Sequence, residues 1–177
     1  MKNICVYCGS SNDVNPEHLD LARSLGQALA TNGFGLVYGG GHNGLMGQAA
    51  DGALEKKGTV TGVIPTFMKE REWAHLGLTE LVEVETMAER KDQFYNRSDA
   101  FITLPGGTGT FEELFETTSL KKLGLLSGEI LILNHGGFYD DLLRFMDKVI
   151  AGGYLPGGET LWAVTTTVEE TVAKLQS

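Results

Sequence analysis

Short apolar runs alternate with longer segments in which apolar residues recur every three or four positions. The runs are typical of buried strands, and they cover residues 4–8, 34–38, 60–64, 81–84, 100–104, 130–134 and 161–164. The longer segments have the spacing of amphipathic helices, and they cover residues 16–31, 45–57, 87–97, 139–151 and 168–175, with a further helix that ends near residue 124. Strands that alternate with helices in this way predict an α/β fold, with a mainly parallel sheet and helices on both faces.

The linkers are short and composition does not change along the chain, so we expect a single domain over residues 1–177. Residues 65–77 are the least regular stretch, and their mix of charged and aromatic residues fits either a lid-like loop or a short helix.

Small and polar residues follow several of the predicted strands. Ligands of parallel sheets bind beyond the carboxyl ends of the strands. The segments at these ends are Gly9-Ser10, residues 39–44, Pro65 and residues 105–110. We therefore expect them to line one shared crevice.

The loop over residues 105–110, Pro-Gly-Gly-Thr-Gly-Thr, lies between a predicted strand and a predicted helix. A strand that turns through glycines into a helix directs backbone N–H groups and the positive end of the helix dipole at whatever lies outside the turn. Gly106, Gly107 and Gly109 would let the backbone approach an anion closely. The loop is therefore predicted to bind a phosphate group.

Glu113 follows this loop and allows two interpretations. Thr110 and Glu113 have the spacing of a capping box, in which Glu113 would only stabilise the start of the helix. Beside a bound phosphate, its carboxylate would instead stabilise positive charge that develops on an adjacent sugar. Local sequence does not choose between the two.

Gly39, Gly41 and Gly44 match the G-x-G-x-x-G pattern of dinucleotide-binding proteins, but they follow the second strand, and no acidic residue ends the next one. We interpret the loop as a second phosphate- or ribose-side loop that includes Gly40 and Gly41. The alternative is a turn that only lets a helix pack closely on the sheet.

Arg90 and Lys91 lie on a predicted helix, where a charged pair is usually solvated, or where Arg90 could project into the crevice. The histidines show no metal-ligand spacing, and His42 in the second glycine loop is most simply a solvated side chain. Cys5 and Cys8 form a C-x-x-C pattern, but their odd separation in a strand predicts opposite faces and argues against a redox pair.

The net charge of −9 argues against nonspecific nucleic-acid binding. No apolar run approaches the roughly 18 residues of a transmembrane helix. With Met1 leading directly into a strand and no signal-peptide pattern, we expect a cytoplasmic protein without membrane or nucleic-acid partners.

The signature at 105–113, Pro-Gly-Gly-Thr-Gly-Thr-Phe-Glu-Glu, resembles the P-G-G-x-G-T-x-x-E motif of the LOG ("Lonely guy") family, the cytokinin riboside 5′-monophosphate phosphoribohydrolases. Further matches cover residues 6–11, 38–41, 44–47 and 87–91, in the same order. Relatives have often been labelled "lysine decarboxylase", but nothing here suggests a pyridoxal phosphate site.

The resemblance implies a Rossmann-like three-layer sandwich that hydrolyses the N-glycosidic bond of a nucleoside 5′-monophosphate without a cofactor or metal, in a homodimer or an assembly of dimers. It assigns catalysis to Arg90 and Glu113. It assigns substrate binding to Glu72, Arg90, Lys91 and the loop that contains Gly106, Gly107, Thr108, Gly109 and Thr110. The shared crevice adds Gly9, Ser10, Gly40 and Gly41 as expected binding residues, and Ser119 is a further one. By analogy with glycoside hydrolysis, Glu113 would hold the ribose and either direct water or form a transient adduct.

The chain departs from the family at two places. His42 stands where relatives often have a small residue, and Ser119-Leu120 replace a common Thr-Trp pair on the base or dimer side. The second difference leaves cytokinin riboside monophosphate and AMP both open as substrates. Two other classes remain, a module that binds a nucleotide without cleaving it and, less favoured, an NAD(P)-dependent oxidoreductase.

Overall fold

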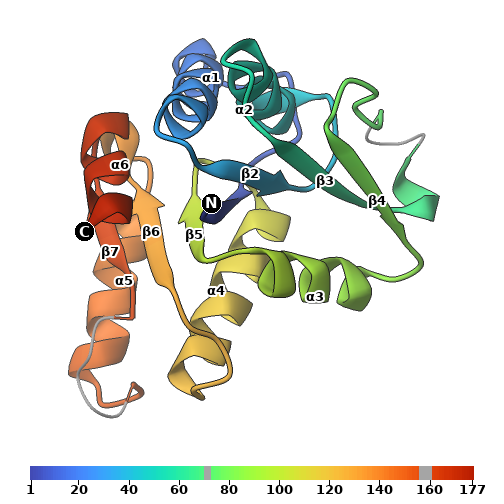
Figure 1. Cartoon of the computed structure of the whole chain (residues 1–177). Helices are drawn as coiled ribbons and strands as arrows, with labels where there is room; N and C mark the ends of the chain where they lie inside the picture. The colour runs from blue at the N-terminus through green and yellow to red at the C-terminus, as the bar shows by residue number, and fades with distance from the viewer. Residues whose placement is uncertain (70–72, 156–160) are drawn as a thin grey trace.

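The computed structural model describes residues 1–69, 73–155 and 161–177. Seven strands form one sheet in the order β4-β3-β2-β1-β5-β6-β7, and every pair is parallel (Figure 1). The strands are β1 (Asn3–Tyr7), β2 (Gly35–Tyr38), β3 (Val60–Pro65), β4 (Glu80–Val84), β5 (Ala100–Thr103), β6 (Glu129–Leu133) and β7 (Ala163–Thr165). The sheet confirms the predicted α/β class.

Helices cover both faces of the sheet. One core contains side chains of α1 (Pro16–Thr31), α2 (Gly44–Glu55) and α6 (Val168–Gln176). The core on the other face contains side chains of α3 (Met87–Arg97), α4 (Thr108–Lys122) and α5 (Asp140–Ala151). Two short 3₁₀ segments, η1 (Thr66–Met68) and η2 (His135–Gly137), complete the chain order. The result is the three-layer sandwich expected from the sequence.

The alternation of side chains along β1 separates the two cores. Cys5 and Tyr7 face the layer of α3, α4 and α5, whereas Val6 and Cys8 face the layer of α1, α2 and α6. The predicted placement of Cys5 and Cys8 on opposite faces is therefore confirmed, and both side chains are buried.

Local sequence explains the start of α1. The Asn15 side chain accepts a hydrogen bond from the Glu17 N–H (3.1 Å), and Pro16 occupies the first helical turn, where its missing N–H costs nothing. Gly33 follows the helix with a φ of +75°, a conformation that glycine adopts without strain.

Glycines bring α1 and α2 into close contact above the sheet. A Cβ on Gly26 of α1 would overlap the backbone of Ala49 in α2, and a Cβ on Gly52 of α2 would overlap the Arg23 carbonyl of α1. The two helices therefore pack backbone against backbone, which holds α2 and the loop before it in place.

We predict that Gly26→Ala destabilises the fold by about 1–3 kcal/mol, because the added methyl overpacks this contact. Gly109→Ala is the matched control. A Cβ there would meet no other atom within 4 Å, so the free energy of unfolding should stay within about 1 kcal/mol. Urea unfolding measures both, and equal losses in the two variants would contradict the proposed contact.

Candidate active site

A cavity of about 230 Å³ opens at the carboxyl end of β1. In the sheet β1 lies between β2 and β5, so the order in which the strands are added changes direction at this point. Such a switch point is where parallel sheets bind ligands. Loops after β1, β2 and β5 form it together with α3 and α4. Its lining residues are Val6, Cys8, Gly9, Ser10, Gly39, Met46, Arg90, Gly107, Thr108, Gly109, Thr110 and Glu113.

The start of α4 forms one wall of this cavity. Gly107 is the N-cap residue, and the first intrahelical bond runs from the Phe111 N–H to the Gly107 carbonyl (3.0 Å). The N–H groups of Thr108, Gly109 and Thr110 precede that bond, so they have no carbonyl of the helix to pair with. Together with the helix dipole they form a binding site for an anion.

Backbone hydrogen bonds fix the loop before α4 against β1. The Leu104 N–H donates to the Tyr7 carbonyl (2.9 Å), and the Gly9 N–H donates to the Pro105 carbonyl (3.1 Å). The buried Tyr139 hydroxyl also donates to the Leu104 carbonyl (2.7 Å). The donors at the start of α4 are therefore positioned before any ligand arrives.

The three glycines of this loop have different roles. A Cβ on Gly106 would overlap the Thr110 side chain, so the fold itself requires glycine there. A Cβ on Gly107 or Gly109 would meet no atom of the protein within 4 Å. Packing does not explain these two glycines, whereas close approach of a ligand does.

The capping interpretation of Glu113 is wrong. Because Gly107 caps α4, Thr110 is the third residue of the helix and Glu113 lies almost two turns inside it. A capping box needs its acidic residue three positions after the cap. Glu113 instead lines the cavity together with Arg90.

A chain of hydrogen bonds holds the Glu113 backbone on the sheet. The Thr117 hydroxyl donates to the Glu113 carbonyl (2.7 Å), so the Tyr7 hydroxyl must donate to Thr117 Oγ1 (2.9 Å). Burial raises the pKa of Tyr7 well above its usual value, which keeps this hydroxyl protonated. Burial also raises the pKa of the Cys5 thiol, and the nearby Glu113 charge adds to the effect.

Arg90 is buried and lines the cavity, so it is not one of the solvated charged residues of its helix. Its side chain donates from Nε to the Val63 carbonyl (3.1 Å) and from Nη2 to the Gly39 carbonyl (2.7 Å), and it lies over the Phe94 ring. A Cβ on Gly39 would overlap the guanidinium. The carboxyl ends of β2 and β3 thus direct Arg90 into the cavity.

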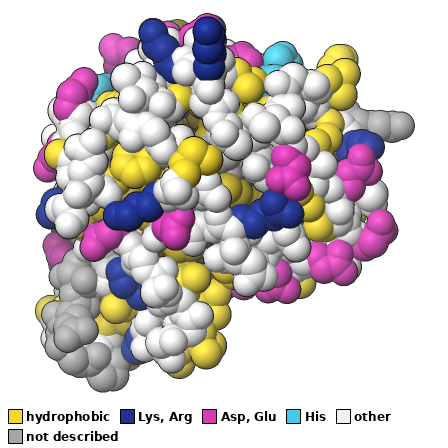
Figure 2. Space-filling model, in the orientation of Figure 1, with side chains coloured by type: hydrophobic (Ala, Val, Ile, Leu, Met, Phe, Trp, Pro, Cys, Tyr) yellow, Lys and Arg dark blue, Asp and Glu magenta, His cyan; other side chains and the backbone are white. Residues whose placement is uncertain are grey.

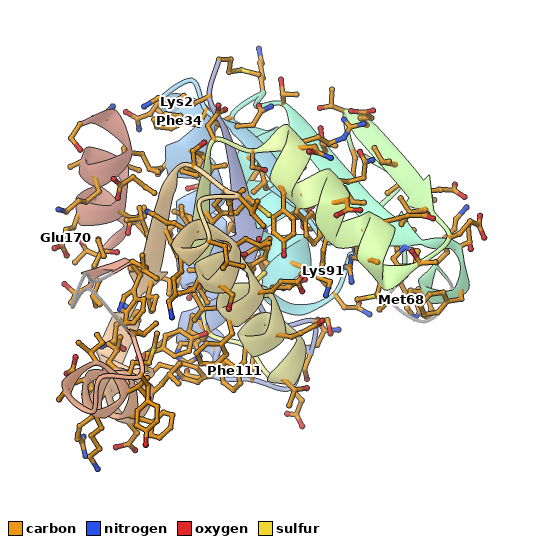
Figure 3. The ribbon with its side chains drawn as sticks, turned by 90° about the horizontal axis from the view of Figure 1, so that it is seen from below. Lys2, Phe34, Met68, Lys91, Phe111 and Glu170 are labelled. Carbon is orange, nitrogen blue, oxygen red and sulfur yellow. The ribbon has the colours of Figure 1, made fainter. Side chains whose placement is uncertain are left out.

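Lys91 points from α3 toward α4, where it forms ion pairs with Glu112 (2.7 Å) and Glu116 (Figure 3). These hydrogen bonds raise the pKa of Lys91. Lys91 is not among the residues that line the cavity, and in this structure it connects two helices beside the site.

The first N–H groups of α2, directly after the loop over residues 39–43, have partners elsewhere in the protein. The Gly44 N–H donates to Asn12 Oδ1 (2.7 Å), and the Leu45 N–H donates to the Gly9 carbonyl (3.0 Å). These contacts favour the close-packing interpretation of this glycine pattern over a second phosphate loop.

The remaining predicted site residues lie in different places. Gly9 and Ser10 line the cavity and also, with Gly106 and Gly107, a neighbouring one of about 620 Å³. Gly40 and Gly41 are outside the cavity lining, where Gly40 packs against β3 and β4 and Gly41 bridges to Ala74. Ser119 lies on α4 and borders a small cavity that is also lined by residues of α5, and Glu72 is outside the described residues.

Sequence reasoning missed Met46, Val6 and Cys8 as lining residues, and it did not single out Gly39 within residues 39–44. Gly39 belongs to a loop that the sequence did single out, but only the path of Arg90 shows which glycine matters. The other three are apolar positions with no signal that distinguishes them from core residues.

A family model and two sequence relatives show to which family the chain belongs. A family model described as "Possible lysine decarboxylase" matches residues 46–175. The probable cytokinin riboside 5′-monophosphate phosphoribohydrolase LOGL9 of Oryza sativa subsp. japonica is 43% identical over 155 residues, which cover 88% of this chain and 68% of that protein. The cytokinin riboside 5′-monophosphate phosphoribohydrolase of Rhodococcoides fascians is 39% identical over 178 aligned positions, which cover 99% and 90%. The chain belongs to the LOG family.

Solved structures agree with the fold of this LOG chain. The molybdenum cofactor carrier protein of Chlamydomonas reinhardtii superposes with a TM-score of 0.77 at 23% identity, over 99% of this chain and 96% of that one. At that identity the likeness establishes the fold alone.

We predict that Tyr7→Phe and Thr117→Val each lower the free energy of unfolding by about 1–2 kcal/mol, because each breaks the chain that ends at the Glu113 carbonyl. The double variant should lose clearly less than the sum, since both changes remove one shared hydrogen bond. Urea unfolding of all four proteins measures this coupling. Strict additivity would show that the two hydroxyls act independently.

Proposed function

We propose that this protein hydrolyses the N-glycosidic bond of nucleoside 5′-monophosphates, releasing the base and ribose 5-phosphate. One observation carries the proposal. The cavity that contains the start of α4 is also lined by Arg90 and Glu113. An anion site, a carboxylate and a guanidinium within one small cavity suit a substrate with a phosphate at one end and a reacting sugar carbon at the other.

The phosphate is bound by the backbone N–H groups of Thr108, Gly109 and Thr110. Gly107 and Gly109 leave room for its oxygens. Recognition through backbone donors favours a nucleotide over its nucleoside, because the nucleoside leaves these donors without an anion.

Glu113 acts at the sugar. As the bond from C1′ to the base nitrogen breaks, positive charge spreads over C1′ and the ring oxygen, and a nearby carboxylate stabilises that charge. The base leaves with the bonding electrons and takes up a proton, while the oxygen of a water molecule bonds to C1′ and that water gives up one proton. Arg90, held rigidly by two backbone carbonyls, keeps the carboxylate and the substrate aligned.

The Rhodococcoides fascians relative is named a cytokinin riboside 5′-monophosphate phosphoribohydrolase, and the Oryza sativa relative a probable one. Their names support this reaction class here, and they make cytokinin riboside monophosphate and AMP the two substrates to compare. Ser119, beside the apolar side chains between α4 and α5, is the position where we expect the chain's base preference or dimer contact to differ from its relatives.

We further propose a homodimer. Phe115 and Phe145, on α4 and α5, are 41% and 60% exposed and border one small apolar cavity. Covering these side chains with a second copy would remove apolar surface from water.

Nucleic acid is not an expected partner. On the face drawn in Figure 2, Lys and Arg side chains are dispersed among acidic ones rather than gathered in a stripe. None of the helices in the described residues is long and apolar enough to cross a membrane.

The test is base release, measured by chromatography after incubation with AMP, isopentenyladenosine monophosphate and the two corresponding nucleosides. We predict release from the monophosphates only, because the nucleosides lack the group that α4 binds. Glu113→Gln, which keeps the shape and removes the charge, should slow turnover on the order of a hundred- to thousandfold. Arg90→Lys should also slow turnover, since a lysine cannot reproduce the two-carbonyl geometry.

Arg97→Lys is the matched control for Arg90→Lys. Arg97 lies on the same helix, pairs with Glu80 outside the cavity lining, and its replacement should leave turnover unchanged. Undiminished turnover by Glu113→Gln would overturn the catalytic assignment. Nucleotide-dependent thermal stabilisation without base release would favour a module that binds nucleotides without cleaving them.

A further inference from the structure

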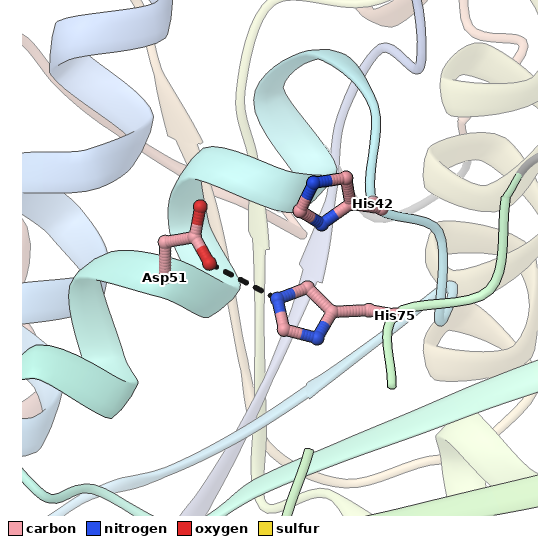
Figure 4. A group of neighbouring side chains, drawn as sticks. All are labelled: His42, Asp51 and His75. Carbon is pink, nitrogen blue, oxygen red and sulfur yellow. Dashed lines mark hydrogen bonds and ion pairs between the residues drawn. The ribbon is translucent and has the colours of Figure 1, made fainter. Parts of the chain in front are cut away.

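His42, Asp51 and His75 form a cluster that involves the loop over residues 39–43 and the helix α2 (Figure 4). His42 belongs to the loop between β2 and α2, Asp51 to α2, and His75 to the segment before β4. Their potential ligand atoms all lie within 4.8 Å of one another. Among residues 1–69, 73–155 and 161–177, it is the one group of three or more His, Cys, Asp or Glu side chains with this geometry.

We propose that this cluster binds one divalent transition-metal ion. Two imidazoles and a carboxylate match the ligand preference of Zn²⁺, Co²⁺ or Ni²⁺, whereas Mg²⁺ and Ca²⁺ prefer sites made of oxygen ligands alone. A solvent molecule would complete the coordination.

Two of the three ligands are already fixed. His75 is 7% exposed, and its Nε2 lies 3.0 Å from Asp51 Oδ1. Asp51 Oδ2 lies 4.0 Å from the Arg23 guanidinium, an outer partner that orients the carboxylate. His42 is exposed, and its ring centroid lies 4.9 Å from that of His75.

The hydrogen bonds of His75 define what metal binding must change. The Gly77 N–H donates to His75 Nδ1 (3.1 Å), so in the metal-free protein the ring proton lies on Nε2 and is donated to Asp51. A metal that binds Nε2 requires this proton to move to Nδ1, which leaves the ring neutral. The Gly77 N–H then loses its acceptor and must turn away.

The proposed metal site lies where the segment at residues 73–77 contacts the loop over residues 39–43. The His75 N–H donates to the Gly40 carbonyl (3.0 Å), and the His42 N–H donates to the Trp73 carbonyl (2.9 Å). The neighbouring Gly39 carbonyl accepts from Arg90. None of the three proposed ligands is among the cavity-lining residues, so the ion has a structural role beside the active site rather than a catalytic one.

Calorimetric titration of the chelator-treated full chain with Zn²⁺ alone tests the proposal. We expect one ion per chain. His42→Ser should weaken binding on the order of a hundredfold, because it removes an exposed ligand without disturbing the fold. Asp51→Asn, which keeps an acceptor for His75 but removes the charge, should weaken binding too. His135→Ser, a histidine outside the cluster, should leave the affinity unchanged.

A second readout is the ¹⁵N and amide NMR spectrum, which needs no enzymatic activity. On adding Zn²⁺ the proton of His75 should move from Nε2 to Nδ1 and the Gly77 amide should shift, while His135 stays unchanged. Equal Zn²⁺ affinity in the original chain and in His42→Ser would overturn the proposal, as would loss of binding in His135→Ser. Circular dichroism of each variant confirms that the fold is retained.

Discussion

The buried guanidinium of Arg90 imposes a constraint on everything around it. Burying a cation away from water costs free energy unless its N–H groups donate hydrogen bonds to acceptors in the protein. Here the carbonyls of Gly39, directly after β2, and of Val63, in the second half of β3, provide them. That requirement fixes the carboxyl ends of β2 and β3 relative to α3 and excludes a side chain at residue 39. The same contacts that satisfy the charge direct it into the cavity that Glu113 lines.

The glycines named above fall into two groups, those that packing within the protein requires and those that it does not. Gly26, Gly39 and Gly106 are required by atoms of the protein itself, because a methyl group at each would overlap a neighbour. Gly107 and Gly109 contact nothing that a methyl group would disturb. The start of α4 therefore combines a rigid frame with an open inner surface, an arrangement suited to binding a phosphate in a geometry set before binding.

Much of this arrangement follows from local sequence. The alternation of strands and helices predicts the layers, and the glycine loop before α4 predicts the anion site, because both depend on neighbouring residues. Local sequence does not show contacts between distant segments of the chain. The position of the N-cap excludes the capping role of Glu113, the path of Arg90 shows which glycine borders the site, and His42 meets His75 only after β3 is placed. Spacing along the chain carries none of that information.

The most direct measurement is a crystal structure of the Glu113→Gln variant with AMP bound. The predicted result places phosphate oxygens within hydrogen-bond distance of the N–H groups of Thr108, Gly109 and Thr110, with C1′ beside residue 113 and the Arg90 guanidinium. A phosphate in the neighbouring cavity lined by Val14, His18 and Phe138, with the sugar away from Arg90, would contradict it.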